Sequence, residues 1–231
     1  GGNPFTNATE NYNGSAWTNS GNLPSNLEAG TCFGTQTAGV IASGNIPPNT
    51  NASAEYNGSA WTAGNAMSRG AGTTGTGFGI QTAGIYATGN VSGSASTLVE
   101  QYNGTNWTEI AEVNRARGGA GASQAGSVTS AVIFGGGPGS GVDAQTETWD
   151  GTSWTEVADL NTARQEGGSF GDSSTNAVFA GGASPAPKVA IVESWNGTSW
   201  TEVADLATSR AYLAAGGASS SSGIVFGGTT G

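Results

Sequence analysis

One short phrase recurs five times along the chain and constrains its fold more than any other feature. The phrase reads aromatic, Asn or Asp, Gly, Ser or Thr, any residue, Trp, Thr, as in Tyr12-Asn13-Gly14-Ser15-Ala16-Trp17-Thr18. Its second aromatic is a Trp at positions 17, 61, 107, 154 and 200, so the steps are 44, 46, 47 and 46 residues. A fixed period of about 20 to 50 residues indicates a repeat architecture such as a solenoid or propeller.

Each copy of the phrase predicts a β-hairpin. Asn-Gly or Asp-Gly between two β-favouring stretches is a strong hairpin signal, and a type I′ turn would need positive φ at both residues. The aromatic before the turn and the Trp after it should pack against each other across the hairpin. A Trp at the same place in every copy is better explained by packing than by sugar stacking. The expected hairpin and packing residues are Asn13, Gly14, Trp17, Asn57, Gly58, Trp61, Asn103, Gly104, Trp107, Asp150, Gly151, Trp154, Asn196, Gly197 and Trp200.

An apolar run that ends in glycine lies between successive hairpins, for example at 131–136 and 223–228. A stretch of Gly, Ala, Ser and Thr comes before each run. Each unit therefore predicts four antiparallel strands, and four-stranded units repeated radially make a propeller. Small side chains on the innermost strands would let a low number of blades close around the axis. We expect one all-β domain over residues 1–231, a five-bladed β-propeller of four-stranded antiparallel blades.

The two ends of the chain predict how the ring closes. Residues 207–231 supply the first two strands of a unit, and residues 1–21 supply the last two. Pairing them would make one composite blade and remove the open edges. The other four blades are expected at about 22–64, 65–111, 112–159 and 160–206.

Composition excludes several classes of function. The chain has 16 Asp and Glu against 6 Lys and Arg, a net charge of −10. Nucleic acid and anionic membrane surfaces need basic footprints, so neither is an expected partner. No apolar run approaches the roughly 18 residues needed to span a bilayer. The absence of His removes the commonest metal ligand and general base, and we expect no metal and no cofactor.

The pattern resembles kelch repeats, as in galactose-oxidase-like propellers. The shared signs are Gly-Gly after an apolar strand, an aromatic-Asp or aromatic-Asn pair, then Trp, then an Arg that opens the next unit. Val225-Phe226-Gly227-Gly228 and Trp149-Asp150 match best, while 42–44 and 87–89 depart from Phe-Gly-Gly. The resemblance implies that loops on one propeller face bind partners. The copper chemistry of galactose oxidase is not implied, because its His ligands have no counterpart. The short units, rich in Asn, Gly, Thr and Trp, also resemble repeats in phage tail and virion proteins.

An arginine recurs where each later unit begins, and the first unit has Asn26 nearby instead. A glutamate precedes the hairpin aromatic by two positions in four units, and Glu55 is displaced by one. We favour ion pairs between these two sets. The alternative places the arginines around one mouth of the channel, where they would bind a carboxylate or an acidic sugar. The arginines are Arg69, Arg117, Arg164 and Arg210, and the glutamates are Glu10, Glu100, Glu147 and Glu193.

Catalysis needs residues that break the repeat, and only two carboxylates near inner strands do so, Glu28 and Glu166. Without His or an orienting partner they make a poor active site. We therefore expect a non-enzymatic recognition or attachment module that binds a glycan or a surface protein, either extracellular or virion-associated, monomeric or part of a larger assembly. A structural or docking propeller is the alternative, and a glycoside hydrolase is less favoured. Binding is expected in the connections 18–30, 44–54, 89–99, 135–146 and 181–190.

Overall fold

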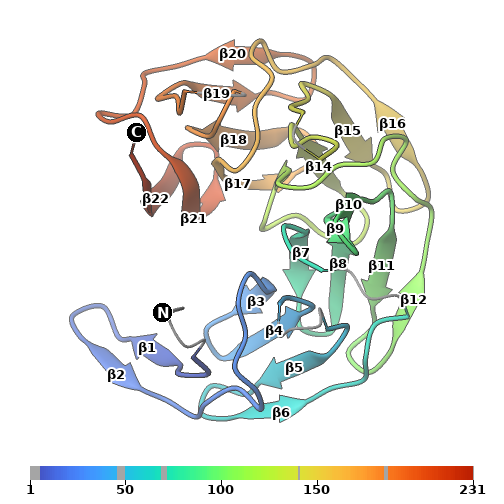
Figure 1. Cartoon of the computed structure of the whole chain (residues 1–231), viewed down its shortest axis with the longest axis vertical. Helices are drawn as coiled ribbons and strands as arrows, with labels where there is room; N and C mark the ends of the chain where they lie inside the picture. Colours follow the sequence, from blue (N-terminus) through green and yellow to red (C-terminus); the bar gives the residue numbers. More distant parts are fainter. Residues whose placement is uncertain (1–5, 46–49, 69–71, 140, 185–186, 231) are drawn as a thin grey trace.

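The computed structural model describes residues 6–45, 50–68, 72–139, 141–184 and 187–230, and in it four-stranded sheets are arranged radially around a common axis (Figure 1). No described residue lies in a helix, so none belongs to a helix that could cross a membrane. The chain runs through each blade from the innermost strand to the outermost. This order is that of a β-propeller.

Four blades are complete, and each is one antiparallel sheet. Blade A contains β3 (Thr31–Thr35), β4 (Ala38–Ala42), β5 (Ser53–Tyr56) and β6 (Trp61–Ala63). Blade B contains β7 (Thr76–Ile80), β8 (Ala83–Ala87), β11 (Val99–Tyr102) and β12 (Trp107–Glu109), with a small extra hairpin of β9 (Asn90–Val91) and β10 (Ser94–Ala95). Blade C contains β13 (Gly121–Ala122), β14 (Ala131–Phe134), β15 (Thr146–Trp149) and β16 (Trp154–Glu156). Blade D contains β17 (Gly168–Ser173), β18 (Asn176–Ala180), β19 (Val192–Trp195) and β20 (Trp200–Glu202).

The predicted composite fifth blade is not formed. The hairpin β1 (Glu10–Tyr12) and β2 (Trp17–Asn19) makes one two-stranded sheet, and β21 (Ala211–Ser219) and β22 (Ser222–Thr229) make another. The ring is open between them (Figure 1). In each complete blade one loop joins the second and third strands and fixes their register, whereas β22 and β1 come from opposite ends of the chain. The structure thus has four blades and two half-sheets, and the count of five is not confirmed.

All five repeated phrases form hairpins, but the predicted turn type is wrong. Tyr12 lies opposite Trp17, and the equivalent pair in blade C, Trp149 and Trp154, has ring centroids 5.1 Å apart. Only the Gly of each turn has positive φ, +97° at Gly14, and the preceding Asn does not. The Asn13 Oδ1 atom accepts from the backbone N–H of Ser15 and Ala16, each at 2.9 Å. This side-chain turn takes the place of type I′ geometry.

The core lies between blades rather than within them. One cluster packs Phe78 and Ile85 of blade B against Ile133 and Trp154 of blade C. Glycines on the first two strands of a blade make room for these contacts, because a Cβ on Gly84 of β8 would lie 2.0 Å from the ring of Phe33 in the preceding blade. Each blade therefore buries its faces only when its neighbours are present.

Candidate functional site: a cavity at the propeller axis

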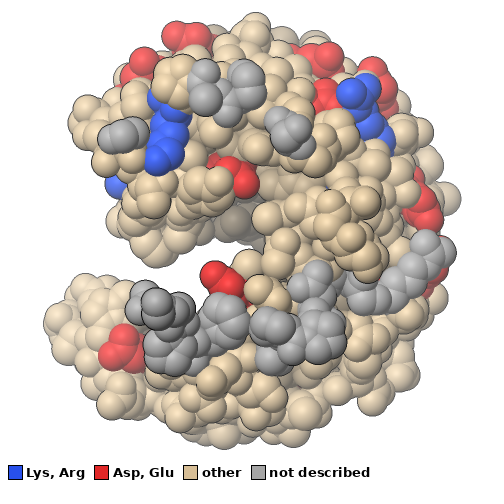
Figure 2. Space-filling view, in the orientation of Figure 1, with Lys and Arg blue, Asp and Glu red and all other residues tan. Residues whose placement is uncertain are grey.

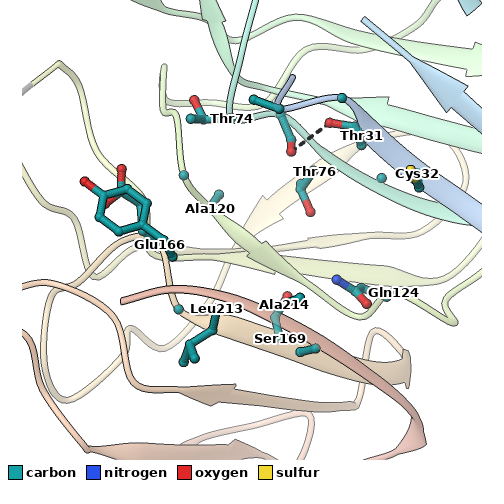
Figure 3. A pocket seen from close by; sticks show the side chains of 18 residues that line it. Thr31, Cys32, Thr74, Thr76, Ala120, Gln124, Glu166, Ser169, Leu213 and Ala214 are labelled. Carbon is teal, nitrogen blue, oxygen red and sulfur yellow. Dashed lines mark hydrogen bonds between the residues drawn. The ribbon is translucent and has the colours of Figure 1, made fainter. Parts of the chain in front are cut away.

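The inner strands of all five units surround a cavity of about 550 Å³ at the axis. Figure 2 shows the hollow, with acidic atoms at its border and the Lys and Arg atoms of this face lying away from it. The wall is built from Gly and Ala together with small polar side chains. Figure 3 shows Thr31, Cys32 and Thr76 on one side and Gln124, Ser169 and Ala214 on the other. The wall is therefore mainly small and apolar, with a few uncharged hydrogen-bonding side chains set in it.

One residue from each unit forms what we call the rim, and all five have left-handed backbone conformation. Four of these residues lie two positions before an inner strand begins, the fifth is the second residue of β21, and all five line the cavity. Their φ values are 53°, 61°, 65°, 59° and 59° for Ala29, Thr74, Gly119, Glu166 and Tyr212. Positive φ is uncommon outside glycine, and such strain gathers at sites where the surrounding structure enforces it. Four of the five rim residues are not glycine.

Hydrogen bonds between neighbouring units explain this backbone conformation. The N–H of Gly119 donates to the carbonyl of Thr74 at 2.9 Å, Glu166 donates to Gly119 at 2.9 Å, and Tyr212 donates to Glu166 at 2.8 Å. In these three residues the left-handed turn points the N–H at the preceding unit. Backbone hydrogen bonds therefore join four of the rim residues, from Thr74 to Tyr212, and hold their inner strands around the cavity.

Glu166 and Tyr212 are the two rim residues with ionisable side chains. Glu166 is the one carboxylate among the described residues that line the cavity, and the Tyr212 side chain hydrogen-bonds to it. Burial raises the pKa of the Glu166 carboxyl, and the bond from Tyr212 opposes that rise. The same bond and the adjacent negative charge raise the pKa of the Tyr212 phenol. The Tyr212 side chain is 62% exposed, so its ring is available to a ligand.

The predicted arginine site is not assembled at the channel mouth. Arg117 is fully buried and pairs with Glu147, and its Nη1 also donates to the Gln145 carbonyl at 2.7 Å. Arg164 is fully buried and pairs with Glu193. Burial lowers the pKa of both guanidinium groups, and the paired carboxylates oppose the shift. These two arginines therefore bind within blades C and D and are not accessible to a ligand.

The remaining two arginines differ from this pair. Arg69 lies outside the described residues. Arg210 is half-buried, and its Nη1 donates to the Gly227 carbonyl at 3.2 Å. The three described members of the recurrent arginine set lie two residues before the rim residue of their unit. The Arg117 and Arg164 side chains reach the third strand, where a buried carboxylate requires a donor. The Arg210 side chain reaches β22.

Blade A replaces the ion pair with apolar residues. Leu27 lies two residues before the rim residue Ala29, and Ala54 lies two residues before the hairpin aromatic Tyr56. Both line a smaller cavity of about 200 Å³. The equivalent of the arginine is therefore Leu27 and not Asn26. Glu55, displaced by one position, accepts a hydrogen bond from the Tyr102 hydroxyl instead.

The variable connections lie on the same face as the rim. Isolated β-bridges join Glu28 to Asn45 and Gln165 to Ala183, so each loop that enters an inner strand lies beside the loop that leaves the second strand. Parts of three predicted binding loops, at 46–49, 140 and 185–186, are outside the described residues. Glu28 is exposed and does not line the cavity, in contrast to Glu166.

Sequence reasoning found Glu166 but missed Tyr212. The available signal was the repeat itself. The position two residues after the recurrent Arg carries Gly119, Glu166 and Tyr212, and it varies while its surroundings repeat. Among the described residues, no group of three His, Cys, Asp or Glu side chains is placed to hold a metal.

The fold and this axial cavity define the chain as a β-propeller. Comparison with solved structures supports the assignment: a chain described as "Structure of YjhT" matches with a TM-score of 0.76 at 13% identity, over 98% of this chain and 91% of that chain. At this identity the likeness shows the fold alone. A scan against family models gave no match, and a search of curated proteins gave no relative.

Proposed function

We propose that this propeller is a non-enzymatic recognition or attachment module that binds a carbohydrate or a host surface through the face bearing the rim. The observation that supports it is the axial cavity, where several hydroxyl side chains and the Gln124 amide line part of a ligand-sized space beside an exposed tyrosine. Sugar hydroxyls are satisfied by such mixed donors and acceptors, and concave sites with a few convergent polar groups are the usual place for small ligands. An extracellular or virion-associated location fits this role.

Glycan-array binding followed by titration tests the proposal. We expect Tyr212→Ala to weaken binding by about tenfold or more, because stacking on the ring and its hydrogen bond are both lost. Ile80→Ala is the matched control, since Ile80 is an exposed apolar residue at the opposite end of an inner strand. Loss of binding in the control, or unchanged binding in Tyr212→Ala, would contradict the proposed site.

Two alternatives have distinct outcomes in the same experiment. A structural or docking propeller would bind a protein partner that sugars do not displace. A glycoside hydrolase would need a pair of carboxylates at the cavity, and Glu166 has no described acidic partner there. We expect no turnover of a glycoside panel, and turnover that is lost in Glu166→Gln would overturn the non-enzymatic assignment.

We also propose that the units are kelch-type and that the working ring has five blades. The phrase Val225-Phe226-Gly227-Gly228, the recurrent arginines and the hairpin Trp residues support the first statement. The second is supported by five rim residues around one axis, one from each unit.

A further inference from the structure

Three long polar side chains break the repeat inside the axial cavity. At the rim positions of Glu166 and Tyr212 the other units have Ala, Thr or Gly. Gln124 lies five residues after the rim residue of its unit, where the other four units have glycine, at Gly34, Gly79, Gly171 and Gly217. All three line the cavity, and Figure 3 shows Glu166 and Gln124 well apart along its wall. The repeat itself therefore does not account for these three side chains.

The cavity carries negative charge, and none of the described residues that line it is a cation. Glu166 is the one charged residue among them, and Figure 2 shows acidic atoms at the border of the hollow. The described basic side chains outside the recurrent set bind elsewhere, since Arg115 pairs with Asp143 and the Lys188 Nζ donates to the Thr230 carbonyl at 2.7 Å. A carboxylate or phosphate on a ligand would thus meet no opposite charge among the described lining residues. A cationic group would be attracted.

The Glu166 carboxylate and the Tyr212 ring together suit an ammonium group. The hydrogen bond from the Tyr212 side chain holds the ring beside the carboxylate. An ammonium would gain charge-assisted hydrogen bonds from the carboxylate and a cation–π contact from the ring face. Further along the wall lie the hydroxyls of Thr76 and Ser169 and the amide of Gln124, which can pair with sugar hydroxyls. One cation position is therefore combined with several hydroxyl positions.

We propose that the axial cavity binds an amino sugar, with the protonated amine between the Glu166 carboxylate and the Tyr212 ring and the hydroxyls along the wall toward Gln124. This inference rests on the proposed function and names the class of carbohydrate. The volume of about 550 Å³ lies in the range of small-ligand sites. A lysine side chain would also neutralise the carboxylate, but its methylene chain would leave the polar groups of the wall without partners.

Paired oligosaccharides test the inference. Oligomers of glucosamine and of galactosamine are each titrated against the protein beside the N-acetylated oligomer of the same length, at neutral pH and low ionic strength. We expect at least one amine form to bind about tenfold more tightly than its acetylated form, because acetylation removes the positive charge. Added salt should reduce this preference.

The outcomes separate this inference from the proposed function. Equal affinity within both pairs, or tighter binding of the acetylated forms, would overturn the amino-sugar assignment and leave carbohydrate recognition standing. A lysine peptide that binds more tightly than every oligomer would also overturn it. Binding of no glycan on an array would contradict the proposed function itself, and the inference with it.

Glu166→Gln tests the carboxylate, because it keeps the shape of the side chain and removes the charge. The preference for the amine form should disappear, so that both forms of the oligomer bind alike. Glu28→Gln is the matched control, since Glu28 is exposed and does not line the cavity. A preference that survives in Glu166→Gln, or that Glu28→Gln removes to the same extent, would overturn the assigned position of the amine.

Gln124→Gly restores the residue that the other units have and tests the far part of the wall. It should weaken both forms of the oligomer by a similar factor, because Gln124 contacts hydroxyls and not the amine. Loss of the amine preference alone in this variant would contradict the proposed orientation. Circular dichroism verifies that each variant keeps its β structure.

Discussion

At the scale of single residues, the Gly and the Asn or Asp before it determine the geometry of each hairpin turn. In each turn an Asn or Asp side chain accepts backbone N–H groups, and the following Gly adopts a φ between 90° and 97°. The space available for a Cβ at these glycines differs between copies of the repeat. A Cβ on Gly14 would meet nothing within 4 Å, whereas one on Gly104 would lie 3.3 Å from the Thr82 Cα. Every turn thus requires Gly for its positive φ. In some blades the neighbouring residues also leave little room for a Cβ.

Gly104→Val should destabilise the protein by more than about 1 kcal/mol, because a β-branched residue resists positive φ and the new Cβ crowds Thr82. Urea unfolding measures the effect. Thr105→Val is the control, since Thr105 is exposed in the same turn and only its backbone N–H contacts Asn103. Equal stability of the two variants would contradict the requirement for glycine.

The raised pKa of Glu166 predicts how stability changes with pH. Because burial raises this pKa, the folded protein holds the proton more tightly than the unfolded chain does. The ionised form therefore costs stability, and the cost is absent below the ordinary Glu pKa of about 4.3 and grows as pH rises through the folded value. Glu166→Gln should gain melting temperature over the parent as pH rises from about 4 to 7.

Melting temperatures measured across this range check the prediction. Glu156→Gln controls for loss of one charge, since Glu156 is exposed on β16. A Glu166→Gln advantage that stays constant with pH would contradict the assignment of the effect to this carboxyl.

At the scale of elements, each blade is held by a pairing between its entry loop and its third strand. The Arg164 guanidinium donates to Glu193 and to the backbone carbonyls of Thr162, Phe179 and Gly181, and Glu193 also accepts from the Asn161 backbone N–H at 2.8 Å. These bonds join the loop to the second and third strands of blade D. The apolar version in blade A shows that the same architecture tolerates Leu and Ala.

Arg164→Leu should destabilise the protein by about 3 to 5 kcal/mol, because it leaves Glu193 buried without its partner. Arg164→Leu combined with Glu193→Ala should recover much of the loss, as the residues of blade A suggest. Urea unfolding of the two single variants and the double variant gives the coupling. Additive losses would show that the two side chains stabilise the blade independently.

At the scale of the whole molecule, the blades depend on one another. Clusters of buried residues span neighbouring blades, for example Phe134 of blade C with Phe179 and Trp200 of blade D. Rim hydrogen bonds run in the same direction around the axis. The half-sheets at the gap have one neighbour each, and this explains why their outer aromatics are exposed. In the proposed five-bladed ring, every unit would have two neighbours.

The sequence alone determined the period, the strand order and the hairpins, because these depend on contacts a few residues apart. It also placed Arg117 and Arg164 in a set with Glu147 and Glu193. Only the tertiary structure decided between an ion pair and a channel-mouth site for these arginines, since burial is set by strands distant along the chain. The rim, the partnership of Glu166 with Tyr212 and the open ring likewise depend on how separate units meet in space. Periodicity specifies each unit, and packing between units decides which of its side chains face the axis.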